Sequence, residues 1–579
     1  MRSSDSLLIL LLSAVLAGCA SAPPASPAPE QVASTSAVAE AVAPKEIKYG
    51  TFTEEQLYQA IISELSAQRG QLEEAGDNYF DLAMETRDLT IIRRAVQFAS
   101  VSGDMNALMQ LGLLWSELEP ANAQPHLMLS FQFLESGNFD QALSHMARVI
   151  DLGGEMDFSA LAARTGRLDP RARAALIENL RQLAREFGAQ ESIRLALVQL
   201  LAQNGEFADA LLEMQLLVQL TDLTPAMILL QAQILQSMED SAQALRVLRN
   251  GVRQFADDKS LRLSYARLLI QNEQFAAAQQ QFEIIVELDP LDWETLYSIA
   301  LLDLEMENFD SAARHFTRLV DVGQRADESQ YYLGYLYEQQ EDFARAIEHY
   351  RQVRIGTNNF LAAQQQATRF SIQMGELEEA HRWLMVLSQG QPRLEILFTS
   401  IESSLLIQSG HAIKAKELLD LALNRHPNET DLLFARVLYH DSQGDRAGSE
   451  VDLRQIILMQ PEDSRALNHL GYMLADQTTR YAEALDLIER AIAISPDDPA
   501  IIDSLAWAQY KLGQYEDALR NLRRAFAAFP DHEVASHLGE VLWMMGRENE
   551  AIQVWDDALQ AQPDSELIRE VIERLNPSR

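Results

Sequence analysis

The 579-residue chain contains a single cysteine, Cys19, and comparatively few basic residues. A lone cysteine excludes an internal disulfide and a site of several thiolates, which leaves an inert filler, a reactive nucleophile or a point of modification. The 47 Lys and Arg residues face 85 Asp and Glu residues, for a formal net charge of −38. Because phosphate binding depends on clustered Lys and Arg, this balance disfavours nucleic acid as a partner.

The apolar run near the start of the chain is short. It covers Leu7–Leu16, LLILLLSAVL, whereas a bilayer core needs about 20 consecutive apolar residues. The run follows the basic Arg2 and precedes small residues, which is the layout of a secretory signal. The sequence therefore favours an export signal over a membrane-spanning helix.

Cys19 closes the sequence LAGC, which resembles the lipobox of bacterial lipoproteins. The resemblance implies that residues 1–18 are a signal peptide and that Cys19 is acylated, for example with palmitate. Ala20 and Ser21 imply, by the same resemblance, an outer-membrane protein that faces the periplasm. A chance cysteine in an ordinary signal peptide is the alternative.

A tether follows the cysteine. Of the 25 residues from Ala20 to Pro44, 18 are Ala, Pro or Ser, and none is aromatic. Such a composition cannot offset the entropy of ordering, so residues 19–46 are expected to be a disordered tether with a reach of about 30 Å. The folded part is expected to divide into residues 47–190, with degenerate repeats, and residues 191–579, with regular ones.

Helical signals run through the whole folded part. Thr53–Gln56, TEEQ, predicts a capping box, and apolar residues recur at helical spacing after it. A small residue that follows a turn then recurs every 33 to 35 residues, which indicates a repeat. These anchor residues are Ala210, Ala244, Ala278, Ala312, Ala346, Ala380, Ala415, Ser449, Ala484, Ala518 and Ala551.

Each period has the composition of a helix pair. Gly334 on a first helix and Ala346 on a second are small enough to let the two backbones approach, and large neighbours fill the remaining space. Proline then ends the second helix, because it cannot continue one. The prolines at this place are Pro290, Pro427, Pro461, Pro496, Pro530 and Pro563.

This pattern of Leu, Gly, Tyr, Ala, aromatic and Pro resembles the tetratricopeptide repeat, most clearly from Ser192 to Pro563. The resemblance implies an all-α superhelical solenoid of about 14 or 15 helix pairs with a long concave surface. That groove would be lined by the first helices. The residues expected there are Tyr331, Tyr335, Asn468, Tyr472, Asp503, Trp507, Tyr510, Glu540 and Trp543.

Upstream the period continues less regularly, through Ala75, Ala107 and Ala142. One degenerate unit is expected before Ala210, with Asp169 and Pro170 as the N-cap and first residue of its second helix. This unit is locally basic, which indicates either a solvated helix face or a docking patch. Its arginines are Arg164, Arg167, Arg171, Arg173, Arg181 and Arg185.

No catalytic motif stands out. The nearest approach to HExxH is His532–His537, HEVASH, where the spacing of five turns the imidazoles about 140° apart around a helix. These are interpreted as two surface histidines. The sequence therefore predicts a protein without enzymatic activity, cofactor or bound metal.

The layout of lipobox, Ala/Pro tether and long repeat solenoid resembles one kind of proteobacterial outer-membrane lipoprotein. The resemblance implies an adaptor that brings cell-wall hydrolases to a periplasmic carboxyl-terminal processing protease. The alternative is a scaffold or pilot lipoprotein for an envelope polymer-export or pilus machine. Either function is binding of periplasmic proteins beside a membrane.

Overall fold

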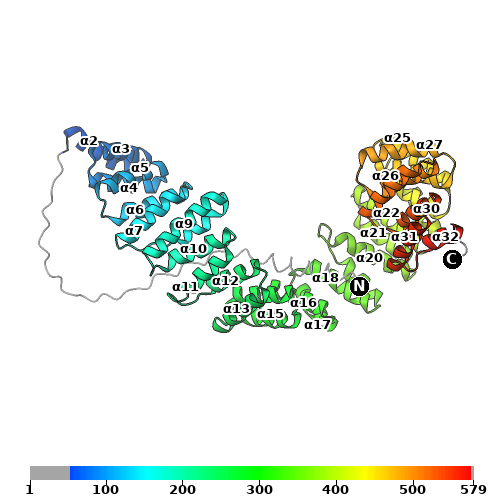
Figure 1. The fold of residues 1–579 in the computed structure, drawn as a ribbon, viewed down its shortest axis with the longest axis horizontal. Coiled ribbons are helices and arrows are strands. Elements are labelled where there is room, and N and C mark those ends of the chain that lie inside the picture. The colour runs from blue at the N-terminus through cyan, green and yellow to red at the C-terminus, as the bar shows by residue number, and fades with distance from the viewer. Residues whose placement is uncertain (1–51, 576–579) are drawn as a thin grey trace. The chain divides into compact units, whose positions relative to one another are not determined.

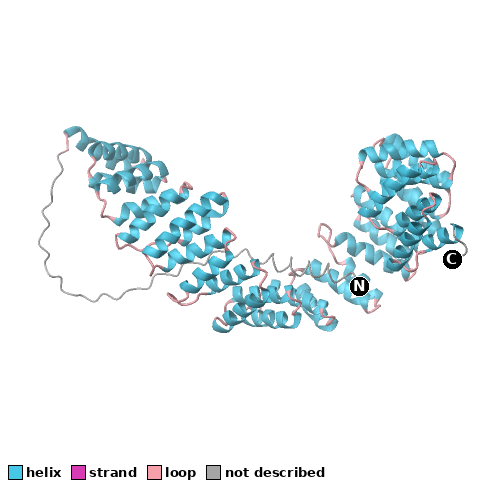
Figure 2. Cartoon of the chain, in the orientation of Figure 1, coloured by secondary structure: helices cyan, strands magenta, loops and turns pink. Residues whose placement is uncertain are grey.

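The computed structural model describes residues 52–575, which are helices joined by short loops without any strand (Figure 2). No helix in this range is both long and apolar enough to cross a membrane. The predicted signal peptide at 1–18, Cys19 and the tether at 19–46 lie outside the described residues.

The chain divides into two compact units at Ala312, within one helix. Figure 1 labels the helices along the chain where there is room. The N-terminal unit begins with α2 (Glu54–Gln68), α3 (Leu72–Thr86), α4 (Leu89–Ser102), α5 (Met105–Leu118), α6 (Ala123–Glu135), α7 (Phe139–Asp151), α8 (Ser159–Arg164), the 3-10 turn η1 (Thr165–Arg167) and α9 (Pro170–Glu186). It continues with α10 (Glu191–Gln203), α11 (Phe207–Leu217), α12 (Pro225–Ser237), α13 (Ser241–Gln254), α14 (Lys259–Gln271), α15 (Phe275–Leu288), α16 (Trp293–Glu305) and α17 (Phe309–Asp321), which contains the division.

The C-terminal unit contains the remaining helices. They are α18 (Ala326–Gln339), α19 (Phe343–Arg351), α20 (Phe360–Gln373), α21 (Leu377–Leu387), α22 (Pro392–Gln408), α23 (Ala412–Arg425), α24 (Thr430–Ser442), α25 (Arg446–Met459), α26 (Ser464–Gln477), α27 (Tyr481–Ile494), α28 (Pro499–Lys511), α29 (Tyr515–Ala528), α30 (His532–Met544), α31 (Glu548–Ala561) and α32 (Glu566–Leu575). The 31 α-helices of the described residues form 15 successive pairs and a final single helix. The even-numbered member of each pair is its first helix, and the prediction of an all-α solenoid of helix pairs is confirmed.

The repeat signals of the sequence have the expected structural roles. The anchor residues from Ala210 to Ala551 lie on second helices, and each is at most 1% exposed. The predicted prolines each follow the last residue of a second helix by two positions. A Cβ on Gly334 would lie 2.7 Å from the ring of Tyr350, so the first helix needs a glycine where the aromatic ring packs.

Local capping predictions are also confirmed. Thr53 and Gln56 form the capping box at the start of α2. Asp169 caps α9 and Pro170 is its first residue, so the degenerate unit begins its second helix where expected. The first helix of this unit, α8, is only six residues long.

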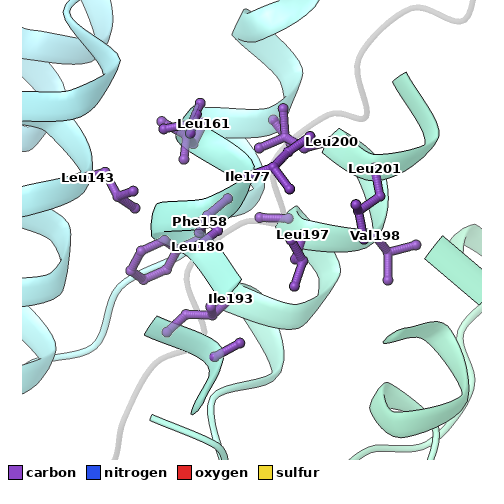
Figure 3. Close-up of a cluster of buried hydrophobic side chains, with 14 of the residues drawn as sticks. Leu143, Phe158, Leu161, Ile177, Leu180, Ile193, Leu197, Val198, Leu200 and Leu201 are labelled. Carbon is purple, nitrogen blue, oxygen red and sulfur yellow. The ribbon is translucent and has the colours of Figure 1, made fainter. Parts of the chain in front are cut away.

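Apolar side chains compensate for the short α8. Phe158, Leu161, Ile177 and Leu180 are buried in one cluster with the side chains of α10 (Figure 3). The core therefore stays continuous from α6 to α12 although one repeat is irregular.

Thirteen of the 15 helix pairs have a residue in the left-handed region at their internal turn, and α8–α9 and α26–α27 are the exceptions. Glycine supplies it in nine pairs, at Gly70, Gly103, Gly137, Gly205, Gly375, Gly410, Gly444, Gly513 and Gly546. In four successive repeats the residue is instead Glu239, Glu273, Glu307 or Glu341, with φ between 56° and 61°. A non-glycine residue pays about 1–2 kcal/mol for this conformation, so the packing of the helix pair, and not the turn residue, fixes the turn.

Candidate functional site

The first helices α26, α28 and α30 enclose a pocket of about 360 Å³. It lies on the surface that the sequence assigned to the groove, and three of the predicted groove residues line it: Asn468, Tyr472 and Asp503. The remaining lining residues are His469, Pro499, Ala500, Ser504, Phe529, Asp531, Glu533 and Val534. The pocket is large enough for one or two side chains of a partner.

A buried ion pair lies beside the pocket, and its carboxylate residue, Asp503, is part of the lining. The Nδ1 atom of His537 lies 2.9 Å from the carboxylate of Asp503, and both residues are buried. Burial alone would lower the pKa of His537, but the carboxylates of Asp503, Glu533 and Glu540 outweigh it and the net shift is upward. The acidic surroundings therefore favour the protonated form of His537.

Trp507 lies directly against this pair. Its ring stacks on the imidazole of His537 with a centroid distance of 4.0 Å, and its indole N–H donates to Asp476 at 3.2 Å. The ammonium of Lys511 lies 4.5 Å from the Trp507 ring centroid. Trp507 therefore contacts Asp476, Lys511 and His537, which lie on three different first helices.

A second polar link crosses two repeats. The hydroxyl of Tyr472 on α26 donates to Glu533 at the start of α30, at 2.8 Å. Burial raises the pKa of Tyr472, and the negative charges of Glu533, Asp476 and Asp503 raise it further. The phenol therefore stays protonated and acts as a fixed donor that holds Glu533 at the pocket.

A third group of polar contacts connects the last helix, α32, to α30 and α28. Glu540 on α30 accepts hydrogen bonds from Tyr510 at 3.0 Å and from Arg574 on α32, one of them at 3.1 Å. Glu540 is only 4% exposed, so both of its oxygens are satisfied inside the protein. This network fixes α28, α30 and α32 to one another.

One acceptor in the pocket has no hydrogen-bond partner among residues 52–575. The Oδ1 atom of Asn468 is buried and makes no hydrogen bond. Asp503, Asp531 and Glu533 add negative charge to the same lining, and the nearby His469 is paired with Asp441. Chemically the pocket offers acceptors and negative charge beside an apolar rim of Phe529 and Val534.

The predicted groove residues differ in how exposed their side chains are. Asp503, Trp507 and Glu540 are each at most 5% exposed, so the expectation of an open surface does not hold for these three side chains. Their polar atoms bond to other first helices, which removes them from solvent. The ring centroids of Trp543 and Trp555 are 5.9 Å apart. Neither Trp543 nor Tyr510 lines the pocket.

Tyr331 and Tyr335 lie on α18 and form no part of this pocket. Both are partly exposed. The ring of Tyr331 contacts Tyr332 and Tyr350, and burial followed by the charge of Glu338 raises its pKa. Of the nine predicted residues, only Asn468, Tyr472 and Asp503 line this pocket.

The interpretation of HEVASH as two surface histidines is wrong for His537. That residue is buried against Asp503, whereas His532 is partly exposed and lies 2.9 Å from the hydroxyl of Ser565. The two imidazoles do bond to different groups on different sides of α30. Among residues 52–575, no group of three or more His, Cys, Asp or Glu side chains could hold a metal ion.

Three arginines of the predicted basic patch bond to other groups of the protein. Arg164 pairs with Glu135, and Arg181 pairs with Glu206 and Asp209. Arg173 donates to the backbone carbonyls of Leu168 and Gln203, which joins η1 to the end of α10. Arg171 and Arg185 are exposed, and the side chain of Arg167 lies outside the described part of the structure.

Sequence reasoning missed His537, Glu533 and Arg574. For His537 and Arg574 the signal was present, because residues one period apart occupy equivalent positions on adjacent first helices, whereas Glu533 bonds to Tyr472 at a separation of 61 residues. His537 follows Asp503 by 34 residues, and Arg574 follows Glu540 by 34. Opposite charges at that spacing predict ion pairs between repeats.

Known proteins resemble this chain over different lengths. A profile of the tetratricopeptide repeat matches residues 229–293, 297–360, 415–499 and 504–566. The TPR repeat-containing protein PA4667 of Pseudomonas aeruginosa is 35% identical over 538 residues, which is 93% of this chain and 90% of that protein.

Solved structures match with low sequence identity. The APC/C hetero-tetramer Cut9–Hcn1 covers 90% of this chain and 97% of the matched chain, with a TM-score of 0.32 and 13% identity. MamA from Desulfovibrio magneticus RS-1 covers 30% of this chain and 97% of its own, with a TM-score of 0.26 and 17% identity.

The repeat profile begins at residue 229, later than the expected start at Ser192, and it leaves residues 361–414 unmatched. The helix pairs nevertheless continue through both segments. With a 35% identical relative along nearly the whole length, the chain belongs to the tetratricopeptide-repeat family, whose stacked helix pairs are protein-interaction scaffolds.

Proposed function

We propose that the chain is a non-enzymatic adaptor that binds partner proteins along its first helices, with the pocket between α26, α28 and α30 as one contact. The observation that carries this proposal is the unpaired acceptor of Asn468 in a pocket of about 360 Å³ lined by Asp503, Asp531 and Glu533. Such a pocket suits a donor from outside the chain, because a buried acceptor without a partner is costly.

Charge defines the partner that the pocket fits. Of the three carboxylates in the lining, Asp503 is already paired with His537, which leaves Asp531 and Glu533 as its acidic groups, and the lining histidine His469 is paired with Asp441. The whole chain has a formal net charge of −38, so basic partners are attracted over long distances at low salt. An extended segment with a Lys or Arg side chain in the pocket and an apolar side chain on Phe529 fits this lining.

The finer proposal concerns location and partners. The lipobox-like LAGC and the Ala/Pro tether support a lipoprotein at the outer membrane, facing the periplasm. The layout resembles adaptors that bring cell-wall hydrolases to a carboxyl-terminal processing protease. Tethering two partners to one scaffold raises their effective concentration to about the millimolar range without any change to an active site.

A cleavage assay tests the adaptor role. The purified chain is mixed with a cell-wall hydrolase, with the protease, or with both. The proposal requires that the protease degrades the hydrolase much faster with the chain than without it. It also requires that the chain alone leaves the hydrolase intact. Loss of hydrolase with the chain alone would show catalysis, and an unchanged rate with all three would favour the polymer-export or pilus scaffold.

The pocket is tested separately by a surface substitution. Phe529 is 58% exposed and lines the pocket, so Phe529→Ala should weaken partner binding while the fold stays intact. Leu458→Ala is the matched control, because Leu458 is 82% exposed on the second helix α25. We expect at least ~10-fold weaker binding for Phe529→Ala and no change for the control. Equal affinities for both variants would exclude this pocket as the contact.

The anchor is tested in cells. Cys19→Ser removes the only sulfur that could be acylated. Fractionation should then move the protein from outer membranes to the soluble periplasmic fraction. A variant that still sediments with outer membranes would contradict the lipoprotein assignment.

A further inference from the structure

The first helix of the described chain, α2, has its large apolar side chains on the outside. Leu57, Tyr58, Ile61 and Leu65 are between 41% and 65% exposed. Their spacing of three to four residues places them in one stripe along the helix. The inward face consists instead of small residues: Ala60, Ser63, Ser66 and Ala67.

This arrangement is the reverse of an ordinary surface helix. A terminal repeat normally turns a polar face to solvent, because there is no further repeat to cover it. Here the small inward residues let α2 approach its neighbours, and the apolar stripe would be covered only by another molecule or segment. Contiguous apolar surface of this kind marks an interaction site.

We propose that the stripe on α2 binds the same stripe of a second copy of the chain, antiparallel and about a two-fold axis. Leu57 and Leu65 lie four residues on either side of Ile61. A two-fold axis at Ile61 therefore places Ile61 against its own copy and each Leu57 against Leu65 of the second copy. Such self-complementarity is what an isologous dimer interface requires.

The charges at the ends of α2 fit the same arrangement. Glu54 and Glu55 occupy the first turn, and Arg69 is the C-cap residue. In an antiparallel pair the acidic end of each helix lies beside the basic cap of the other. A parallel pair would instead place the four acidic residues together, which disfavours that orientation.

The interface is small, and the two chains repel each other through their net charge. Interfaces below ~1,200 Å² belong to weak complexes, so we expect a dimer with a Kd on the order of micromolar or weaker. Salt screens the repulsion but not apolar contact, so added salt should strengthen the dimer.

Sedimentation equilibrium tests the interface with the full chain carrying Cys19→Ser. Ile61→Glu should raise the dimer Kd at least ~10-fold, and Ile61→Ala should raise it by a smaller factor. Val101→Glu is the control, because Val101 is 68% exposed on α4, away from the stripe. Helix content should be unchanged in each variant, since the substituted side chains are on the surface.

Thiol crosslinking tests the two-fold axis itself. With Cys19 replaced the chain has no other cysteine, so Ile61→Cys introduces one thiol at the expected axis. A short bifunctional crosslinker should join two such chains efficiently. Gln59→Cys, exposed but turned about 200° from Ile61 around the helix, should react poorly.

Three results would overturn the proposal. They are a monomer at every concentration, self-association that Ile61→Glu leaves unchanged, and equal crosslinking at both cysteines. A monomer whose Ile61→Glu variant loses a defined protease partner would assign the stripe to that partner instead. The adaptor proposal does not depend on this result, because its pocket lies on α26, α28 and α30.

Discussion

The first and last helices of the described chain differ in where they place their large side chains. On α2 the large apolar residues face outward and small residues face inward. On α32, Ile568 and Val571 are buried, and Arg574 reaches back to Glu540. The last helix therefore closes the hydrophobic core, whereas the first leaves apolar surface to be covered. An end of a solenoid can thus be a cap or a binding surface, depending on which face carries the large residues.

The same contrast holds for charged residues. Near the C-terminal end, Asp503 pairs with His537 inside the protein. Near the N-terminal end, Arg87 pairs with Glu117 at the surface, where the side chains are 48% and 67% exposed. The first pair is part of the fold's interior, and the second is solvated on both sides.

The largest expected loss of stability follows from removing the buried Asp503–His537 pair. Asp503→Ala leaves the buried His537 without its carboxylate partner, which should destabilise the C-terminal unit by up to about 3–5 kcal/mol, less if the imidazole releases its proton. Glu117→Ala, which removes the exposed pair, should cost at most about 1 kcal/mol. Urea unfolding followed by circular dichroism measures both. Similar costs would mean that the buried pair is more hydrated than its exposure indicates.

The two end helices can be compared by making the same Ile→Ala substitution on each. Ile568→Ala removes a fully buried side chain on α32 and should cost about 2–5 kcal/mol. Ile61→Ala, at a side chain 52% exposed on α2, should change stability by at most about 0.5 kcal/mol in the monomer. Dilute samples are needed for this measurement, so that self-association does not contribute. A large cost at Ile61 in dilute solution would show that α2 packs differently.

Glycines on the two ends should respond in opposite directions. A Cβ on Gly539 would lie 2.0 Å from the indole nitrogen of the buried Trp555, so Gly539→Ala should cost about 1–3 kcal/mol by overpacking. A Cβ on Gly76, within α3, would lie an ordinary 3.7 Å from Phe98. Gly76→Ala should therefore stabilise by about 0.5–1 kcal/mol, because alanine favours a helix. Thermal unfolding that moves in the same direction for both variants would contradict this packing.

The fold was predictable because its signals are local or strictly periodic. The capping box at Thr53, the N-cap at Asp169 and the buried anchor alanines follow from short-range rules repeated along the chain. The 34-residue period also contained the Asp503–His537 pair, which needed only a comparison of equivalent positions. Periodicity could not show that Trp507 would be buried, because that depends on how closely adjacent first helices approach. It also could not show which face of α2 is covered, because an amphipathic pattern does not specify what lies against it.

The smallest expected effect is a loss of stability of the C-terminal unit at alkaline pH. Free histidine has a pKa of 6.5, and the pKa of His537 is raised in the folded protein, because Asp503, Glu533 and Glu540 outweigh its burial. The folded state then binds the proton more tightly than the unfolded state. This stabilisation is complete below pH 6.5 and is lost as pH rises through the raised pKa.

Unfolding of the C-terminal unit should accordingly require less urea as the pH rises above 6.5. His145, near the N-terminal end, supplies the opposite case, because burial and the neighbouring His126 lower its pKa to about 4. Its contribution to stability is lost on acidification, between pH 6.5 and 4, and is constant above that range. A His537→Gln variant should therefore weaken the alkaline slope, and the part that remains should come from His381, whose pKa is raised by its hydrogen bond to Glu402. His145→Gln should instead weaken the acid slope, to which the lowered pKa of His126 also contributes. An alkaline slope that is undiminished in His537→Gln would contradict the raised pKa of His537, because His381 alone would then account for the coupling of this end of the chain to pH.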